Sequence, residues 1–159
     1  MTYQIYSNNR GGGGGQNQPR SSQTQTFDQL AEVVRSECFS TNYSELLKMG
    51  STQNLDSILK SIEVFVQKYG VKVSTSQLRN VYDKVTKTKS VNELKLLRPQ
   101  LAYIAGRATT DKDNKDNIKK FLAFIDYLIK QVSSEEQRKE FKTFFESVVA
   151  YHKFNSKTN

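Results

Sequence analysis

The sequence lacks most of the residues on which catalysis and covalent crosslinking depend. Its 159 residues include one histidine, one cysteine and no tryptophan. A single cysteine, Cys38, cannot form a disulfide within the chain, so a reducing environment is the natural setting. The single histidine, His152, falls near an apolar helical pattern, where packing is favoured over catalysis. We therefore expect neither an enzyme nor a bound cofactor.

Sequence motifs for nucleotides and metals are missing as well. The chain has no Walker loop, no dinucleotide fingerprint and no pair of zinc ligands. The segment DKDNKD at 111–116 starts like a calcium loop, with Asp111 and Asp113 at the first and third positions. It then has Asp116 in place of the required glycine and Leu122 in place of the final glutamate. We interpret it as a polar loop with acids at the start of the next helix, and we expect no metal.

Long hydrophobic runs are absent, and positive charge is abundant. No apolar run approaches the roughly 20 residues that cross a bilayer, and no signal-peptide pattern opens the chain, so a cytoplasmic protein is expected. The formal net charge is +8, and residues 71–110 hold eight basic and only two acidic residues. Such a concentration of positive charge is typical of phosphate binding, although it also serves solubility or an acidic protein partner.

The composition divides the chain into two parts. Residues 1–26 contain five consecutive glycines and many polar residues, and they cannot bury enough apolar surface to offset the entropy of ordering them. We predict a disordered, glycine-rich N-terminal tail over 1–26 and one domain over 27–159.

Beyond the tail, apolar residues recur with helical spacing. Helices are predicted over 27–38, over 55–69 with Gly70 as the stop, and over 118–132. Four further predictions concern caps and linkers: Asn42 caps a short turn, Ser74 and Ser90 each begin a helix, Ser133 with Glu136 caps the last helix, and VKVST at 71–75 is an extended linker. The fold class is all-α, a compact bundle of five to six helices.

The segment LRPQLAYIAGR at 97–107 does not suit an ordinary core helix. Pro99 must either kink a helix begun earlier or start a new one with Arg98 held extended. Gly106 favours a helix end, after which Arg107 would leave the helix. From the residues alone, the small side chains could equally serve tight helix packing, and the two arginines could be solvated or paired with acids.

Three separated blocks carry a resemblance to a known family. TSQLR (75–79), LRPQLAYIAGR (97–107) and FKTFFESVVAYHKF (141–154) resemble the small subunit of the type III-A CRISPR effector, the Csm complex. The resemblance spans about residues 71–154. It implies a helical subunit without a catalytic site, several copies of which lie beside the guide RNA and the target RNA in antiviral defence. The implied partners are these RNAs, other Csm subunits and further copies of the chain.

The resemblance also implies which residues bind RNA. Arg79 and Arg107 would face RNA phosphates, and Arg98 is a further candidate. Lys72 is a fourth candidate, because it lies near a helix start whose free amides favour anions. Four other lysines are interpreted as a solvated face: Lys84, Lys87, Lys89 and Lys95.

Two hypotheses of function follow. In the first, the chain is a noncatalytic RNA-binding subunit that lines the guide and target RNA and stabilises their pairing. In the alternative, it is a helical adaptor between protein subunits without direct RNA contact. Four tyrosines could stack on bases, but their helical spacing favours core packing: Tyr82, Tyr103, Tyr127 and Tyr151.

Overall fold

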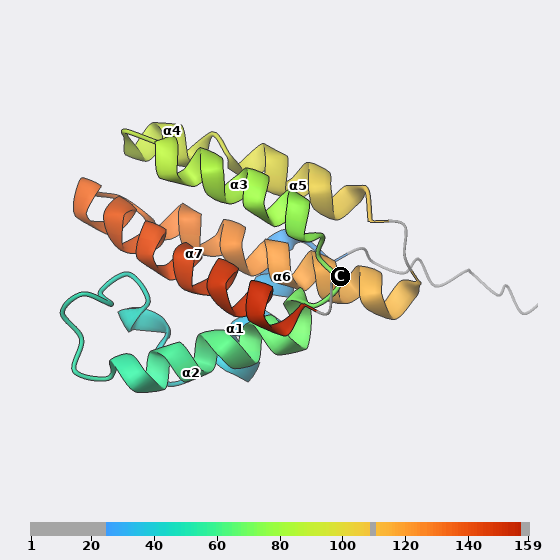
Figure 1. Ribbon diagram of the computed structural model, residues 1–159, viewed down its shortest axis with the longest axis horizontal. Coiled ribbons are helices and arrows are strands. Elements are labelled where there is room, and N and C mark those ends of the chain that lie inside the picture. The colour runs from blue at the N-terminus through green and yellow to red at the C-terminus, as the bar shows by residue number, and fades with distance from the viewer. Residues whose placement is uncertain (1–24, 109–110, 157–159) are drawn as a thin grey trace, which may run out of the picture.

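The computed structural model describes residues 25–108 and 111–156, and all regular structure within them is helical (Figure 1). The α-helices are α1 (Phe27–Cys38), α2 (Leu55–Phe65), α3 (Thr75–Lys87), α4 (Val91–Lys95), α5 (Arg98–Gly106), α6 (Lys112–Gln131) and α7 (Glu135–Asn155). A 3₁₀ turn spans Tyr43–Glu45, and a π-helical turn, Val66–Gly70, extends α2. The all-α prediction is confirmed. Residues 1–24 of the predicted tail lie outside the described residues.

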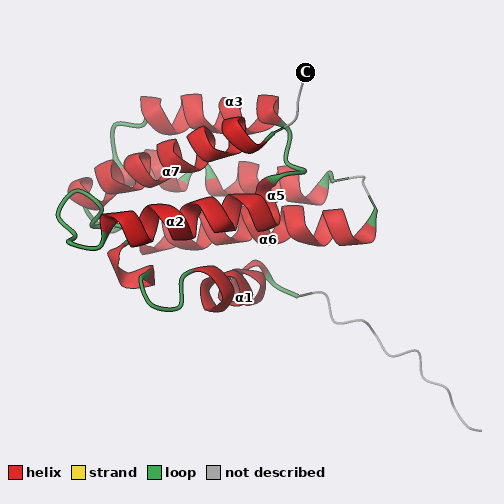
Figure 2. Cartoon of the chain, turned by 60° about the horizontal axis from the view of Figure 1, so that its bottom comes forward, coloured by secondary structure: helices red, strands yellow, loops and turns green. Residues whose placement is uncertain are grey.

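Helices α6 and α7 form the centre of the bundle. Helix α1 and helix α5 pack on α6, whereas α2 and α3 pack on α7, as the two views of the chain show (Figures 1 and 2). The apolar stripe of α6 predicted over 118–132 is buried along its length. None of the helices within the described ranges is long and apolar enough to cross a membrane.

Phenylalanine rings dominate the core between these helices. Phe124 of α6 stacks on Phe39 with a centroid distance of 4.7 Å, and Phe121 stacks on Phe65 at 4.9 Å. Fully burying one such ring contributes roughly 1.5–3 kcal/mol, and stacked pairs add about 0.5–1.5 kcal/mol. The rings therefore determine how closely α1 and α2 approach α6.

The helical stretch that begins at Leu55 ends at Gly70, as predicted, but Gly70 also has a packing role. The backbone continues in helical geometry through the π-turn into Val71, and no glycine of the described residues has a positive φ. A Cβ atom added to Gly70 would lie 2.7 Å from Cε2 of Phe121. Only glycine allows this close approach of the turn to α6. Consequently residues 71–73 form a turn, and the prediction of an extended linker over 71–75 is wrong.

Helix α3 is held at both ends by α7. At its C-terminal end, Arg138 Nη1 donates to the carbonyl oxygen of Thr88 at 2.6 Å, and Lys142 Nζ donates to the same oxygen at 3.2 Å. Desolvation, reinforced by the charge of Arg138, lowers the pKa of Lys142. Cations at a helix C-terminus also complement the helix dipole. The axis of α3 is thus anchored to α7 by side chains far away in the sequence.

Two of the predicted helix caps, in which the partners are three residues apart, are confirmed. The hydroxyl groups of Ser74 and Ser90 accept hydrogen bonds from the amides of Gln77 and Glu93, as expected. The last helix, however, is capped by Ser134 and not by Ser133. The side chain of Gln137 accepts from the amide of Ser133, so the box is displaced by one residue.

Two other capping residues differ from expectation. Asn42 makes no cap, because its amide group donates to Ser61 on α2 at 2.9 Å. Thr26, assigned to the tail, forms a complete capping box with Gln29 at the start of α1. The N-terminal side of the domain therefore begins with Thr26.

The segment around Pro99 forms two helices, α4 and α5. Pro99 lies in the first turn of α5, where its missing amide hydrogen is tolerated. The alternative in which Pro99 starts a new helix is therefore correct. Arg98 is nevertheless helical and not extended. Helix α5 ends at Gly106, as expected, and Arg107 is its C-cap, whose amide still donates to the carbonyl oxygen of Tyr103 at 3.0 Å.

The contact between Gly70 and Phe121 gives a direct test of the packing. Gly70→Ala should lower the free energy of unfolding by about 1–3 kcal/mol, because the ring or the turn must move. Gly106→Ala is the matched control, since its Cβ would meet nothing within 4 Å. It should be neutral or stabilising by up to about 1 kcal/mol. Urea unfolding of both variants measures the difference, and equal effects would contradict the close approach.

Candidate nucleic-acid interface

The N-terminus of α3 is bordered by a hollow that contains two of the predicted RNA-binding residues. Lys72, Ser74 and Gln77 line one side of this hollow. Residues of α5 and the chain beyond it, including Ile104 and Arg107, line the other. Its volume is about 240 Å³, and none of its lining residues is acidic. The structure therefore brings Lys72 and Arg107 together.

A second, smaller hollow of about 110 Å³ lies between α3 and α7. Arg79 lines it together with Lys153, and again no lining residue is acidic. Thr75, in the first turn of α3, also lines this hollow, and its buried hydroxyl oxygen has no hydrogen-bond partner among the described residues. Lys153 was missed in the sequence, where its only signal is its place in the block 141–154.

The start of α3 adds its own positive potential to both hollows. Its first turn contains no acidic residue, and Ser74 caps it. The free amides of a first turn and the aligned peptide dipoles favour an anion at that end. Two pairs of cations thus flank one positively polarised helix end.

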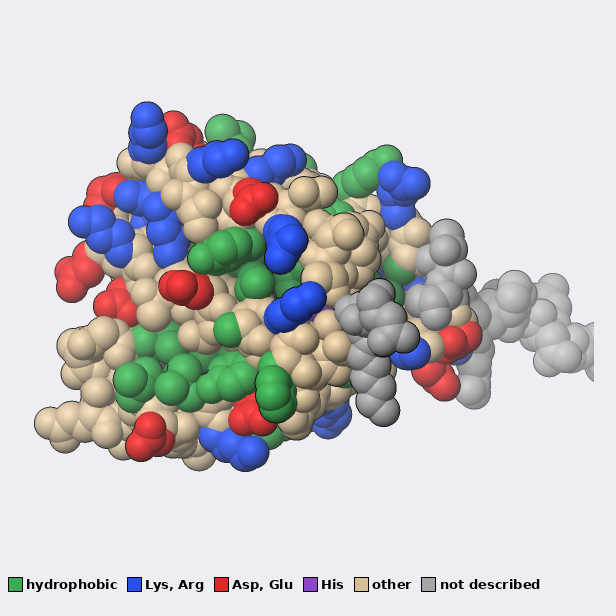
Figure 3. Space-filling model, in the orientation of Figure 1, with side chains coloured by type: hydrophobic (Ala, Val, Ile, Leu, Met, Phe, Trp, Pro, Cys, Tyr) green, Lys and Arg blue, Asp and Glu red, His purple; other side chains and the backbone are tan. Residues whose placement is uncertain are grey.

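The side chains of these cations are available for binding. Lys72, Arg79 and Arg107 are exposed and form no ion pair with any carboxylate of the described residues. Arg107 contacts Tyr103, whose hydroxyl oxygen lies 3.3 Å from its Nη1. A ligand would therefore not have to displace an acid from any of the three. On the face seen in Figure 3, basic side chains are spread over α3 and α7, and hydrophobic side chains gather toward α2.

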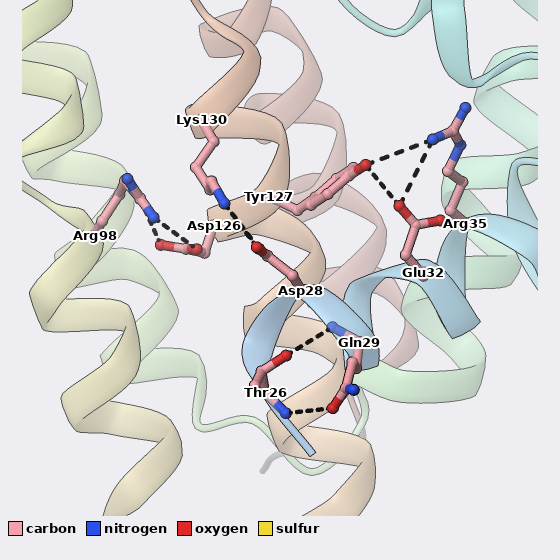
Figure 4. Close-up of polar contacts among 9 residues, drawn as sticks. All are labelled: Thr26, Asp28, Gln29, Glu32, Arg35, Arg98, Asp126, Tyr127 and Lys130. Carbon is pink, nitrogen blue, oxygen red and sulfur yellow. Dashed lines mark hydrogen bonds and ion pairs between the residues drawn. The ribbon is translucent and has the colours of Figure 1, made fainter.

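Arg98 lies apart from the other three candidates. Its Nε is 2.9 Å from Oδ1 of Asp126 on α6, and the side chain of Asp126 is only 6% exposed (Figure 4). A neighbouring pair joins Lys130 to Asp28 at 2.8 Å. These four side chains line a separate hollow of about 520 Å³ between α1, α5 and α6, where the acids offset much of the positive charge.

His152 of α7 holds the turn on which Lys72 lies. It is 2% exposed, and its Nε2 lies 2.9 Å from the carbonyl oxygen of Val73. Because a carbonyl can only accept, Nε2 must carry the hydrogen. The bond ties α7 to the turn between Lys72 and Ser74. Its burial agrees with the predicted packing role.

Cys38 and the tyrosines complete the comparison with expectation. Burial raises the pKa of the Cys38 thiol to about 11, so it stays protonated at neutral pH and is a poor nucleophile. Tyr82, Tyr127 and Tyr151 are partly buried, as predicted. Tyr103 is 62% exposed, so the prediction of core packing is wrong for this residue. No group of three or more potential metal ligands occurs in the described part of the chain.

The ion pair of Arg98 generates a prediction about stability. Arg98→Ala leaves the buried carboxylate of Asp126 without its partner, and we expect a loss of about 1–3 kcal/mol in unfolding free energy. Replacing both residues by leucine should recover part of this loss. Arg79→Ala, which removes an exposed cation without an ion pair, should change stability by less than about 0.5 kcal/mol.

Chemical denaturation of the wild type and these three variants measures the differences in unfolding free energy. A loss for Arg79→Ala as large as that for Arg98→Ala would contradict the division between a structural and an available arginine.

Together, the fold and the surface define an all-helical protein with two cationic hollows beside the start of α3. The family model Csm2 Type III-A matches residues 51–158, about two thirds of the chain, and the chain belongs to this family. The family supplies the small structural subunit of the type III-A CRISPR effector, the Csm complex, and is generally noncatalytic. No curated protein and no solved structure matches the chain.

Proposed function

We propose that this subunit lines the guide RNA and the target RNA within the Csm complex and stabilises their pairing through phosphate contacts. The observation that carries the proposal is the pair of hollows at the start of α3, each with two cations and no acid. Its site of action would be the cytoplasm, beside the other subunits and further copies of itself, without membrane contact.

The chemistry of the two hollows suits a ligand that is read by its backbone. Guide and target sequences vary, so a subunit that serves all of them must contact phosphates and not base edges. Lysine and arginine on rigid helices supply such contacts, and Arg107 can do so in a bidentate manner. We assign phosphate contacts to Arg79 and Arg107 first, with Lys72 beside Arg107. Arg98 would contribute only with the part of its guanidinium that Asp126 does not engage.

A protein adaptor without RNA contact is the competing function. Leu96 and Phe154 favour it, because they are 75% and 83% exposed and offer apolar contact area to a neighbouring subunit. Both are outside the lining of the two hollows. Protein contacts and RNA contacts can therefore be tested separately.

Charge reversal tests the RNA proposal in the assembled complex. Changing both Arg79 and Arg107 to Glu should weaken target-RNA binding and flatten its dependence on salt. Each lost phosphate contact lowers the slope of log K against log salt by about 0.7–0.9. The measurement is target affinity at several salt concentrations, with equal subunit stoichiometry established first.

Lys87 and Lys89 supply the matched control. Both side chains are exposed and lie at the far end of α3, so reversing both changes the charge by the same amount. We expect a much smaller effect. Equal losses in the two double variants would indicate a diffuse field and contradict the site. No loss in either variant would favour the adaptor.

A further inference from the structure

Tyr103 is an exposed aromatic residue that contacts Arg107, one of the residues that line the hollow with Lys72. It is 62% exposed, whereas its neighbours Leu101 and Ala105 on the inner face of α5 are buried. Tyr103 makes no ring contact with another aromatic residue of the described chain. The packing of the protein itself does not account for the outward position of this ring.

The ring is held beside a phosphate-binding candidate. Arg107 follows Tyr103 by four residues, so the two side chains lie one turn apart on the same side of the helix. The guanidinium carbon of Arg107 is 5.4 Å from the ring centroid, and its Nη1 is 3.3 Å from the hydroxyl oxygen. The hydroxyl accepts from Arg107 and orients it, while much of the ring remains open to solvent.

The surface next to the ring leaves room for a planar group. Ala102 and Gly106 are exposed, and a Cβ placed on Gly106 would meet nothing within 4 Å. An open aromatic ring next to an arginine matches the two parts of a nucleotide, because bases stack on aromatic rings and phosphates bind guanidinium groups.

We propose that Tyr103 stacks on an unpaired nucleobase of the bound RNA while Arg107 holds an adjacent phosphate. This inference rests on the proposed function and adds a preference to it. Bases inside a continuous duplex are stacked on one another and present no face to a side chain. The subunit would therefore bind RNA with an exposed nucleotide more tightly than an uninterrupted duplex.

The test separates stacking from charge by using the assembled complex. Tyr103→Leu keeps an apolar side chain but removes the ring, and we expect target affinity to fall at least about fivefold at every salt concentration. The slope against salt should be unchanged, because stacking releases no counterions. Tyr103→Phe keeps the ring and should bind within about twofold of wild type. Val64→Ala, at another exposed apolar position on α2, should have no effect.

A second readout reports the base itself. Target RNAs carrying one 2-aminopurine, either unpaired or paired, serve as probes. In the wild type and in Tyr103→Phe, fluorescence of the unpaired probe should be quenched on binding, and the unpaired RNA should bind more tightly. Tyr103→Leu should lose both the quenching and the preference.

The possible results distinguish this inference from the function on which it rests. Wild-type affinity in Tyr103→Leu would overturn stacking, and equal losses in the Leu and Phe variants would replace it by a hydroxyl contact. Impaired incorporation of the Leu variant with normal RNA affinity would indicate a protein contact and also overturn it. If reversal of Arg79 and Arg107 still weakens binding, the proposed function stands without stacking. If that reversal also has no effect, both the proposed function and the stacking by Tyr103 are overturned.

Discussion

The close approach of Gly70 to Phe121 is the constraint on which the candidate interface depends. Because no side chain intervenes, the π-turn lies directly against α6, and the chain then forms a turn over 71–73. His152 then holds this turn from α7 through the carbonyl of Val73. Lys72 and the first turn of α3 are therefore positioned by the core and not by a flexible loop, so a ligand at this end meets a preorganised surface.

Cations in this basic protein are used in two distinct ways. Arg98 and Arg138 pair with carboxylates or buried carbonyls and hold helices together. Lys72, Arg79 and Arg107 face solvent without an ion pair among the described residues. Composition alone does not separate these groups, because an arginine beside a buried acid and one beside solvent look alike in the sequence. The distinction arises only when α5 is packed against Asp126.

The parts of the structure that were predictable from the sequence are those determined within one helix. The buried stripe of α6 and the serine caps of α3 and α4 depend on residues at most a few positions apart. The turn at 71–73 and the pairing of Arg98 depend instead on contacts across the bundle, with Phe121 and Asp126. Periodicity contains no information about such partners. Lys153 was missed for the same reason, because only the packing of α7 brings it close to Arg79.

The position of Arg107 directly after the end of α5 fixes its relation to Tyr103. The amide of Arg107 donates to the carbonyl oxygen of Tyr103 at 3.0 Å, so the i and i+4 side chains lie one turn apart and contact each other. Tyr103 therefore cannot be considered as an isolated aromatic residue, since its hydroxyl orients a cation at the edge of the hollow. The same turn of helix that exposes the ring also determines where a phosphate next to it would bind.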